Sequence, residues 1–109
     1  MAANDYHVIV FQILTHLYSQ LKNGEKPRTS AIAHDGELFE INYSYWVYIM
    51  RNMLEEGYIT GIRITDNSQV RGLENCEITP KGIEYIADNK MFDKVMDYIR
   101  GREDIPTMI

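Results

Sequence analysis

The sequence predicts a single α+β domain in which three helices come first, a two-stranded β-hairpin follows, and one or two helices complete the fold. Three observations support this prediction. Apolar residues recur at helical spacing in two long segments, β-branched and aromatic residues are concentrated between residues 58 and 64, and helix-capping residues stand at the boundaries. The chain of 109 residues, 45% hydrophobic and 25% charged, has the composition of one globular domain. We expect a core over about residues 5–100, with residues 101–109 as a flexible tail.

The first predicted helix reaches about Lys22, and Asn4 and Asp5 are suitable N-cap residues before it. One face is apolar because its residues recur at spacings of three and four. These residues are Tyr6, Ile9, Val10, Ile13, Leu14, Leu17 and Leu21. Phe11 and Tyr18 widen the face beyond what one core contact requires. We therefore expect either a second helix of the same chain or a partner chain to cover them.

Residues 25–41 are less regular and predict a second helix of only two turns. Thr29 or Ser30 is a plausible cap for this helix, and Gly36 stops it. An extended segment over residues 38–41 follows.

The third predicted helix lies between Asn42, which can cap it, and Gly57, where a left-handed C-terminal residue is expected. At about 100° per residue, two faces separate. The inner face holds Trp46, Ile49, Met50, Met53 and Leu54. The outer face holds Ser44, Tyr45, Tyr48, Arg51, Asn52 and Glu55.

After Gly57 the pattern changes from helix to strand. Residues 58–64 predict one strand, residues 74–78 a return strand, and the stretch from Thr65 to Gly72, which contains Asp66-Asn67-Ser68, the tip of the hairpin. Thr79-Pro80 then supplies an N-cap and a proline at the first helical position. The inner face of that helix is predicted to hold Ile83, Ile86 and Ala87.

A last helical segment from Met91 to Arg100 places four apolar residues on one stripe. This stripe and the wide first helix either pack on each other or form a two-fold homodimer interface. The residues of that candidate interface are Phe11, Tyr18, Phe92, Val95, Met96 and Ile99. A dimer becomes necessary if the protein binds palindromic DNA, because half-site spacing then follows from the two-fold symmetry.

Helix, short helix, helix, two-stranded hairpin, helix, helix is the element order of a winged helix. LEEGYI (residues 54–59) and ITPKG (residues 78–82) resemble the ends of the hairpin in winged-helix regulators. With GIEYI (residues 82–86) and DNKMFDK (residues 88–94), the chain is similar to the YjcQ-like family over about residues 5–100. That family comprises small winged-helix proteins of Gram-positive bacteria and their prophages. The resemblance implies a fold and a phage or prophage origin, and it supplies no catalytic residue and no ligand.

Charge and cysteine content bear on partners and location. The 16 acidic residues outnumber the 11 basic ones, for a net charge of -5, which argues against strong non-specific binding to DNA or anionic membranes but allows a local basic face. Cys76 is the single cysteine, so no intramolecular disulfide forms and a reducing cytoplasm is the expected location. The longest apolar run, Val8 to Phe11, is far shorter than a membrane span, and no signal peptide is expected.

The sequence shows no pattern typical of catalysis, and we expect no enzyme, no cofactor and no metal. His7, His16 and His34 are too widely spaced for a metal site on one helix. No glycine-rich phosphate loop is present. Glu55 and Glu56 are adjacent, so their carboxylates point about 100° apart on a helix and do not share acid–base work.

The outer face of the third helix is the best functional candidate, and the leading hypothesis is a DNA-binding protein of the transcriptional-regulator type. In a winged helix this element enters the major groove, where Arg51 could contact guanine and Asn52 adenine. Ser44 and Tyr48 could reach base edges or phosphates, and arginines outside this helix could contact the flanking backbone. The residues predicted to contact nucleic acid are Ser44, Tyr45, Tyr48, Arg51, Asn52, Arg28, Arg63 and Arg71.

Two other interpretations fit the same face. The outer face also fits a solvated, tyrosine-rich helix surface without a binding role. Glu55 on this face would repel DNA phosphate. Tyr45, Tyr48 and Arg51 are residue types enriched at protein–protein hot spots, so an adaptor that binds an unknown protein partner is the alternative function. A contiguous positive patch across the helix and the hairpin favours DNA, whereas a neutral tyrosine-rich patch favours protein.

Overall fold

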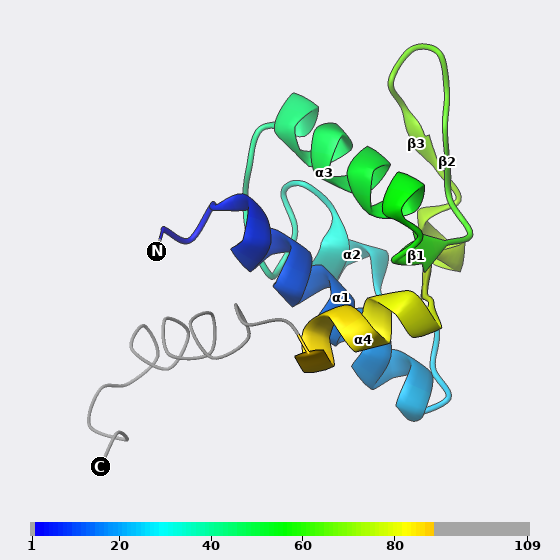
Figure 1. Ribbon diagram of the computed structural model, residues 1–109. Coiled ribbons are helices and arrows are strands. Elements are labelled where there is room, and N and C mark those ends of the chain that lie inside the picture. The colour runs from blue at the N-terminus through cyan, green and yellow to red at the C-terminus, as the bar shows by residue number, and fades with distance from the viewer. Residues whose placement is uncertain (1, 89–109) are drawn as a thin grey trace.

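The computed structural model describes residues 2–88, which form an α+β fold with two small antiparallel sheets (Figure 1). The predicted stripe Phe92, Val95, Met96 and Ile99 and the tail 101–109 lie outside the described residues. The described elements in chain order are α1 (Tyr6–Lys22), α2 (Thr29–Ile32), α3 (Tyr43–Glu56), β1 (Ile59–Thr60), β2 (Arg63–Ile64), β3 (Val70–Arg71), the 3-10 helix η1 (Leu73–Asn75), β4 (Glu77–Ile78) and α4 (Pro80–Asp88).

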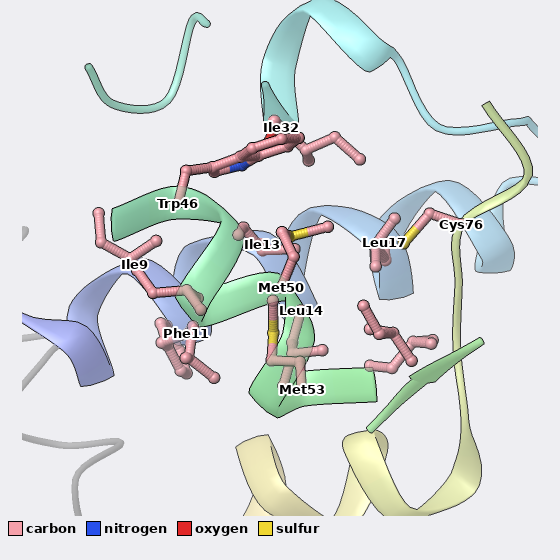
Figure 2. Close-up of a cluster of buried hydrophobic side chains, with 14 of the residues drawn as sticks. Ile9, Phe11, Ile13, Leu14, Leu17, Ile32, Trp46, Met50, Met53 and Cys76 are labelled. Atoms are coloured by element: carbon pink, nitrogen blue, oxygen red, sulfur yellow. The ribbon is translucent and has the colours of Figure 1, made fainter. Parts of the chain in front are cut away.

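The hydrophobic core lies where α1, α2 and α3 meet the base of the hairpin (Figure 2). All buried side chains in the described part of the chain are apolar. The indole N–H of Trp46 donates to the carbonyl oxygen of Ile32 at 2.9 Å, so this buried polar group is satisfied and α2 is held against α3. Val47, which the predicted inner face left out, is also buried, and Leu54 is half-buried.

Helix α1 ends where the sequence predicts, but its buried side differs from the predicted apolar face, because Val8, which that face left out, is buried and Leu21 is exposed. Phe11 is only 6% exposed and belongs to the core, so its side chain is covered within one chain. Tyr18 packs partly buried against that core, and the Lys22 ammonium lies 4.6 Å from its ring centroid. Leu21, predicted on the inner face, is 48% exposed, because it is in the last turn and borders an open cavity.

Helix α2 has one turn, and the prediction of two turns was wrong. A second turn would use the carbonyl oxygens of Ser30 and Ala31, but these accept from the backbone N–H groups of Glu37 at 2.8 Å and Leu38 at 3.4 Å. The residue in the N-cap position is Arg28, without a side-chain cap, in place of the predicted Thr29 or Ser30. Loop contacts therefore end this helix early.

Helix α3 has both predicted ends. The Asn42 side chain accepts from the backbone N–H groups of Ser44 at 2.7 Å and Tyr45 at 3.4 Å. Gly57 has a φ of 83° and donates to the Leu54 carbonyl oxygen at 3.1 Å, which closes the last turn in the left-handed geometry that favours glycine.

The hairpin consists of two short ladders separated by a break, not the single continuous pair that was predicted. β1 pairs with β4, and β2 pairs with β3. The stretch before Cys76, predicted as return strand, is η1, whereas Val70 and Arg71, predicted in the tip, are paired. Gly61 with a φ of 95° turns one strand at the break, and its backbone lies against the Asn75 carbonyl group. The tip is therefore shorter than predicted and spans residues 65–69.

Helix α4 begins as predicted and is tied to the end of α3. The Thr79 hydroxyl accepts from the Gly82 N–H at 3.1 Å and donates to the Gly57 carbonyl oxygen. Ile86 is buried and Ile83 half-buried, but Ala87 is exposed, so the predicted inner face was too wide. Over residues 2–88, none of the helices combines the length and apolar character that crossing a membrane requires.

Candidate functional site

The side of α3 that faces away from the core carries four residues at spacings of four, three and four, which we call the outer stripe: Ser44, Tyr48, Arg51 and Glu55. Ser44, Tyr48 and Glu55 are exposed and Arg51 is half-buried. Tyr48, at 55% exposed, is the largest aromatic surface of the helix that reaches solvent. Three of the residues predicted to contact nucleic acid are thus brought together on one line, with one carboxylate at its C-terminal end.

Tyr45 and Asn52, which were also predicted to contact nucleic acid, lie on a flank of α3. The Tyr45 hydroxyl donates to the Asn4 carbonyl oxygen at 2.7 Å, and burial, with smaller effects of Asp5 and Tyr48, raises the pKa of this tyrosine. The Asn52 amide donates to the Tyr48 carbonyl oxygen at 2.7 Å, within its own helix. Bidentate contact with adenine needs the amide donor and acceptor together, so Asn52 must give up this bond before it can take that role.

An aromatic surface adjoins the outer stripe on the side of α1 and α4. The ring of Tyr6 meets that of Tyr48 edge to face, with centroids 6.2 Å apart, and also contacts His7. His7 Nδ1 and the Tyr85 hydroxyl oxygen are 2.9 Å apart. Burial, followed by the neighbouring Tyr48, raises the pKa of Tyr6. The sequence did not reveal Tyr6 as a neighbour of Tyr48, because only the packing of α1 on α3 joins them.

The hairpin presents two arginines directly opposite each other. Arg63 on β2 and Arg71 on β3 are cross-strand partners, and the next pair, Ile64 and Val70, packs against the core. Because side chains alternate along a strand, the two arginines share the opposite, solvent-exposed face. Like charges in this position repel. Neither they nor Arg51 makes an ion pair with any residue of the described range 2–88.

This pairing was not predicted, although the sequence holds a signal for it. Residues 63 and 71 are equidistant from Asn67, the middle of the turn-forming stretch Asp66-Asn67-Ser68. Taking this stretch as the centre of a short tip would have placed the arginines opposite each other. The longer predicted tip concealed their relation.

Arg28 stands apart from the other three arginines that were predicted to contact nucleic acid. Its guanidinium forms an ion pair with Glu37 at 2.7 Å, and the Ser30 hydroxyl donates to the same carboxylate at 3.2 Å. Its backbone N–H donates to His16 Nε2 at 3.4 Å. Burial, and then the Arg28 charge, lowers the pKa of His16. The positive charge of Arg28 is therefore largely balanced where it lies.

Comparison with known proteins identifies one family. A family model described as "YjcQ protein" matches residues 11–105, which include α3, the hairpin and α4. The resemblance that the sequence motifs predicted is confirmed at the level of the family. No curated protein and no solved structure matches the chain.

Proposed function

The chain belongs to the YjcQ protein family, and from that premise we propose that it is a bacterial or prophage winged-helix DNA-binding protein of the transcriptional-regulator type. In this proposal α3 is the recognition helix and the β2–β3 hairpin is the wing, and the protein performs no catalysis and needs no cofactor. The order of helices and hairpin supports the winged-helix assignment, and the hairpin stands beside α3 (Figure 1).

The single observation that carries the proposal is the cross-strand pair Arg63 and Arg71. Two unbalanced guanidinium groups facing each other on a two-residue ladder cost stability in the isolated protein. An anion between them reverses the sign of that interaction, and arginine matches phosphate oxygens in bidentate geometry. A DNA phosphate is an anion of this kind, and it would lie next to the helix that enters the groove.

The outer stripe supports a defined orientation of α3. In helix-turn-helix proteins the N-terminal residues of the recognition helix contact the bases. Ser44 lies at that end, Arg51 in the middle, and Glu55 near the C-terminal end, where a carboxylate would be least exposed to phosphates and bases. Arg51 is therefore the residue proposed to contact a guanine, with Tyr48 and Ser44 on either the bases or the adjoining backbone.

A second function has an observation of its own. Tyr48 is 55% exposed and adjoins the neutral surface of Tyr6 and Tyr45, which is the composition of a protein–protein hot spot. The net charge of -5 also suits a protein partner better than DNA. The alternative is therefore an adaptor that binds an unidentified protein through the same stripe.

Fluorescence anisotropy tests the first proposal. The full chain is titrated into labelled mixed-sequence duplex DNA at low and moderate salt, together with Arg51→Ala, the double variant Arg63→Ala/Arg71→Ala, and Lys22→Ala. Lys22 is an exposed cation at the far end of α1, so it is the matched control for a lost positive charge. We expect micromolar or tighter binding with a log–log salt slope of at least about 1 in magnitude, since the phosphate proposed to lie between Arg63 and Arg71 contributes about -0.9.

The variants separate specific contacts from overall charge. The double variant is expected to reduce the magnitude of the salt slope by about 1, because the phosphate contact is lost. Arg51→Ala, which removes a proposed base contact, should weaken binding by about 1 to 3 kcal/mol and leave the slope unchanged, and Lys22→Ala should change neither. Equal weakening by Lys22→Ala would contradict a site on α3 and the hairpin. Absence of binding at low salt to mixed-sequence DNA and to a pool of randomised duplexes would overturn the DNA proposal and leave the adaptor.

A further inference from the structure

A cavity of about 340 Å³ opens between the C-terminal end of α1, the loop that follows it, and the segment from η1 to β4. Its size is that of a site for a small molecule. Buried apolar side chains, Leu17, Cys76 and Ile78, lie at its base, and the exposed Leu21 extends the apolar wall toward solvent. The cavity lies on a part of the molecule that the proposed DNA interface does not use.

The loop that forms one wall of this cavity is held in place by α1. The Gln20 side chain donates to the Glu25 carboxylate at 3.3 Å and to the Lys26 carbonyl oxygen at 3.2 Å. The backbone N–H of Glu25 also donates to the Gln20 carbonyl oxygen at 2.9 Å. Three bonds to one residue keep the loop open beside the helix, so the cavity is formed before any ligand arrives.

The polar residues around the cavity carry an excess of negative charge. Glu25 and Glu74 contribute two carboxylates and Lys26 one ammonium group, a balance of -1. Glu77 on β4 lies between the buried Cys76 and Ile78, so its side chain points to the other side of the strand. Within the described range, Glu74 takes part in no ion pair. A ligand with a positive charge and an apolar body therefore complements both the apolar base and the carboxylates.

We propose that this cavity binds a small organic cation, a primary ammonium group on an apolar body, with the body against Leu17, Leu21 and Ile78 and the ammonium beside Glu74. The ligand is held without a covalent bond. Cys76 does not act as a nucleophile, because burial, with a smaller effect of Glu77, raises the pKa of its thiol to about 12.

Ligand binding in the cavity should affect the hairpin through one residue, Asn75. Asn75 lines the cavity, and its carbonyl group lies against the backbone of Gly61 at the break between the two ladders. A ligand beside Asn75 is thus one residue away from the point where the hairpin changes direction. The backbone amide of Gly61 is a reporter of binding outside the cavity itself.

The test is a ¹H–¹⁵N NMR titration of the full chain with 4-phenylbutylamine, with 4-phenylbutyrate as the probe of opposite charge. We expect saturable millimolar binding of the amine, with shifts of the amides of residues 20–26, 74–77 and Gly61. Binding of 4-phenylbutyrate should be at least about tenfold weaker. Equal binding of both probes, or shifts that do not saturate or lie elsewhere, would overturn the proposal.

Two variants test which carboxylate binds the ammonium group of the ligand. The variant Glu74→Gln is expected to weaken amine binding about tenfold, whereas Glu84→Gln, which removes an exposed carboxylate on α4, leaves it unchanged. A matching loss in Glu84→Gln would overturn the assignment to the cavity. Far-ultraviolet circular dichroism of each variant confirms that it is folded. No DNA is present in this experiment. The ligand proposal can therefore fail while the DNA proposal stands, and the DNA proposal can fail while the ligand proposal stands.

Discussion

Helix α3 and the hairpin that follows it differ in what determines their shape. Both ends of α3 are fixed by residues next to it, the side-chain cap of Asn42 and the left-handed Gly57. The break in the hairpin is fixed by Asn75, which lies 14 positions after Gly61 and approaches its backbone only in the folded chain. Local interactions define the helix, and a non-local contact defines the hairpin, so substitutions in the two regions should act through different physical terms.

The largest expected effect concerns the buried side of α3. Met50→Ala should lower the free energy of unfolding by about 3 to 4 kcal/mol, because Met50 is fully buried and the substitution leaves a cavity. Ser44→Ala, on the outer stripe of the same helix, should change it by less than about 0.5 kcal/mol. Urea denaturation of the two variants measures both values. Similar losses would mean that the outer stripe is packed against something and is not a free surface.

The next effect concerns the hairpin. Gly61→Ala should cost about 2 to 3 kcal/mol, since the new Cβ would collide with the Asn75 carbonyl oxygen and the backbone has a positive φ. Gly24→Ala is the matched control, with a φ of 71° and open space around its Cβ. It should cost only about 1 kcal/mol of backbone strain. Denaturation curves give the difference, and equal losses would show that the contact with Asn75 does not shape the hairpin.

The same distinction explains how much of the fold could be predicted. Residues at the boundary mark the ends of α1 and α3, so both were predicted correctly. The single turn of α2 could not be, because the backbone N–H groups of Glu37 and Leu38 return to its carbonyl oxygens from a loop without regular pattern. The break at Gly61 and the helix η1 depend on each other across the hairpin, and neither strand alone indicates them.

The residues of the candidate site also divide into those set by local sequence and those set by non-local contacts. The outer stripe follows from helical periodicity, so Ser44, Tyr48 and Arg51 were placed together from the sequence. Periodicity gives the direction of a side chain but not its partner. The bonds of Tyr45 to Asn4 and of Arg28 to Glu37 join residues 41 and 9 positions apart, and helical periodicity indicated neither. The cavity is a non-local feature of the same kind, since its walls come from residues 17–27 and 74–78.

The smallest expected effect concerns the N-cap residues of α3 and α1. Asn42→Ala should cost about 1 kcal/mol, because its side chain satisfies two N–H groups of α3 that otherwise have no partner in the helix. Asp5→Ala, at the same position of α1, should cost only about 0.3 kcal/mol. The Asp5 carboxylate accepts from the Ala2 N–H at 3.0 Å and caps no N–H group of α1, so the substitution removes that exposed bond and the attraction to the helix dipole but no cap of the helix.

Urea denaturation of both cap variants at low salt checks this difference. An equal loss in the two would mean that the charge and shape of an N-cap residue matter here more than its hydrogen bonds. A larger loss for Asn42→Ala, with an unchanged dependence on denaturant, would show that the start of α3 is set by this one side chain. Because Ser44 is the second residue after the cap, the cap also fixes the first position of the outer stripe, and the same substitution should weaken any ligand that this end of α3 binds.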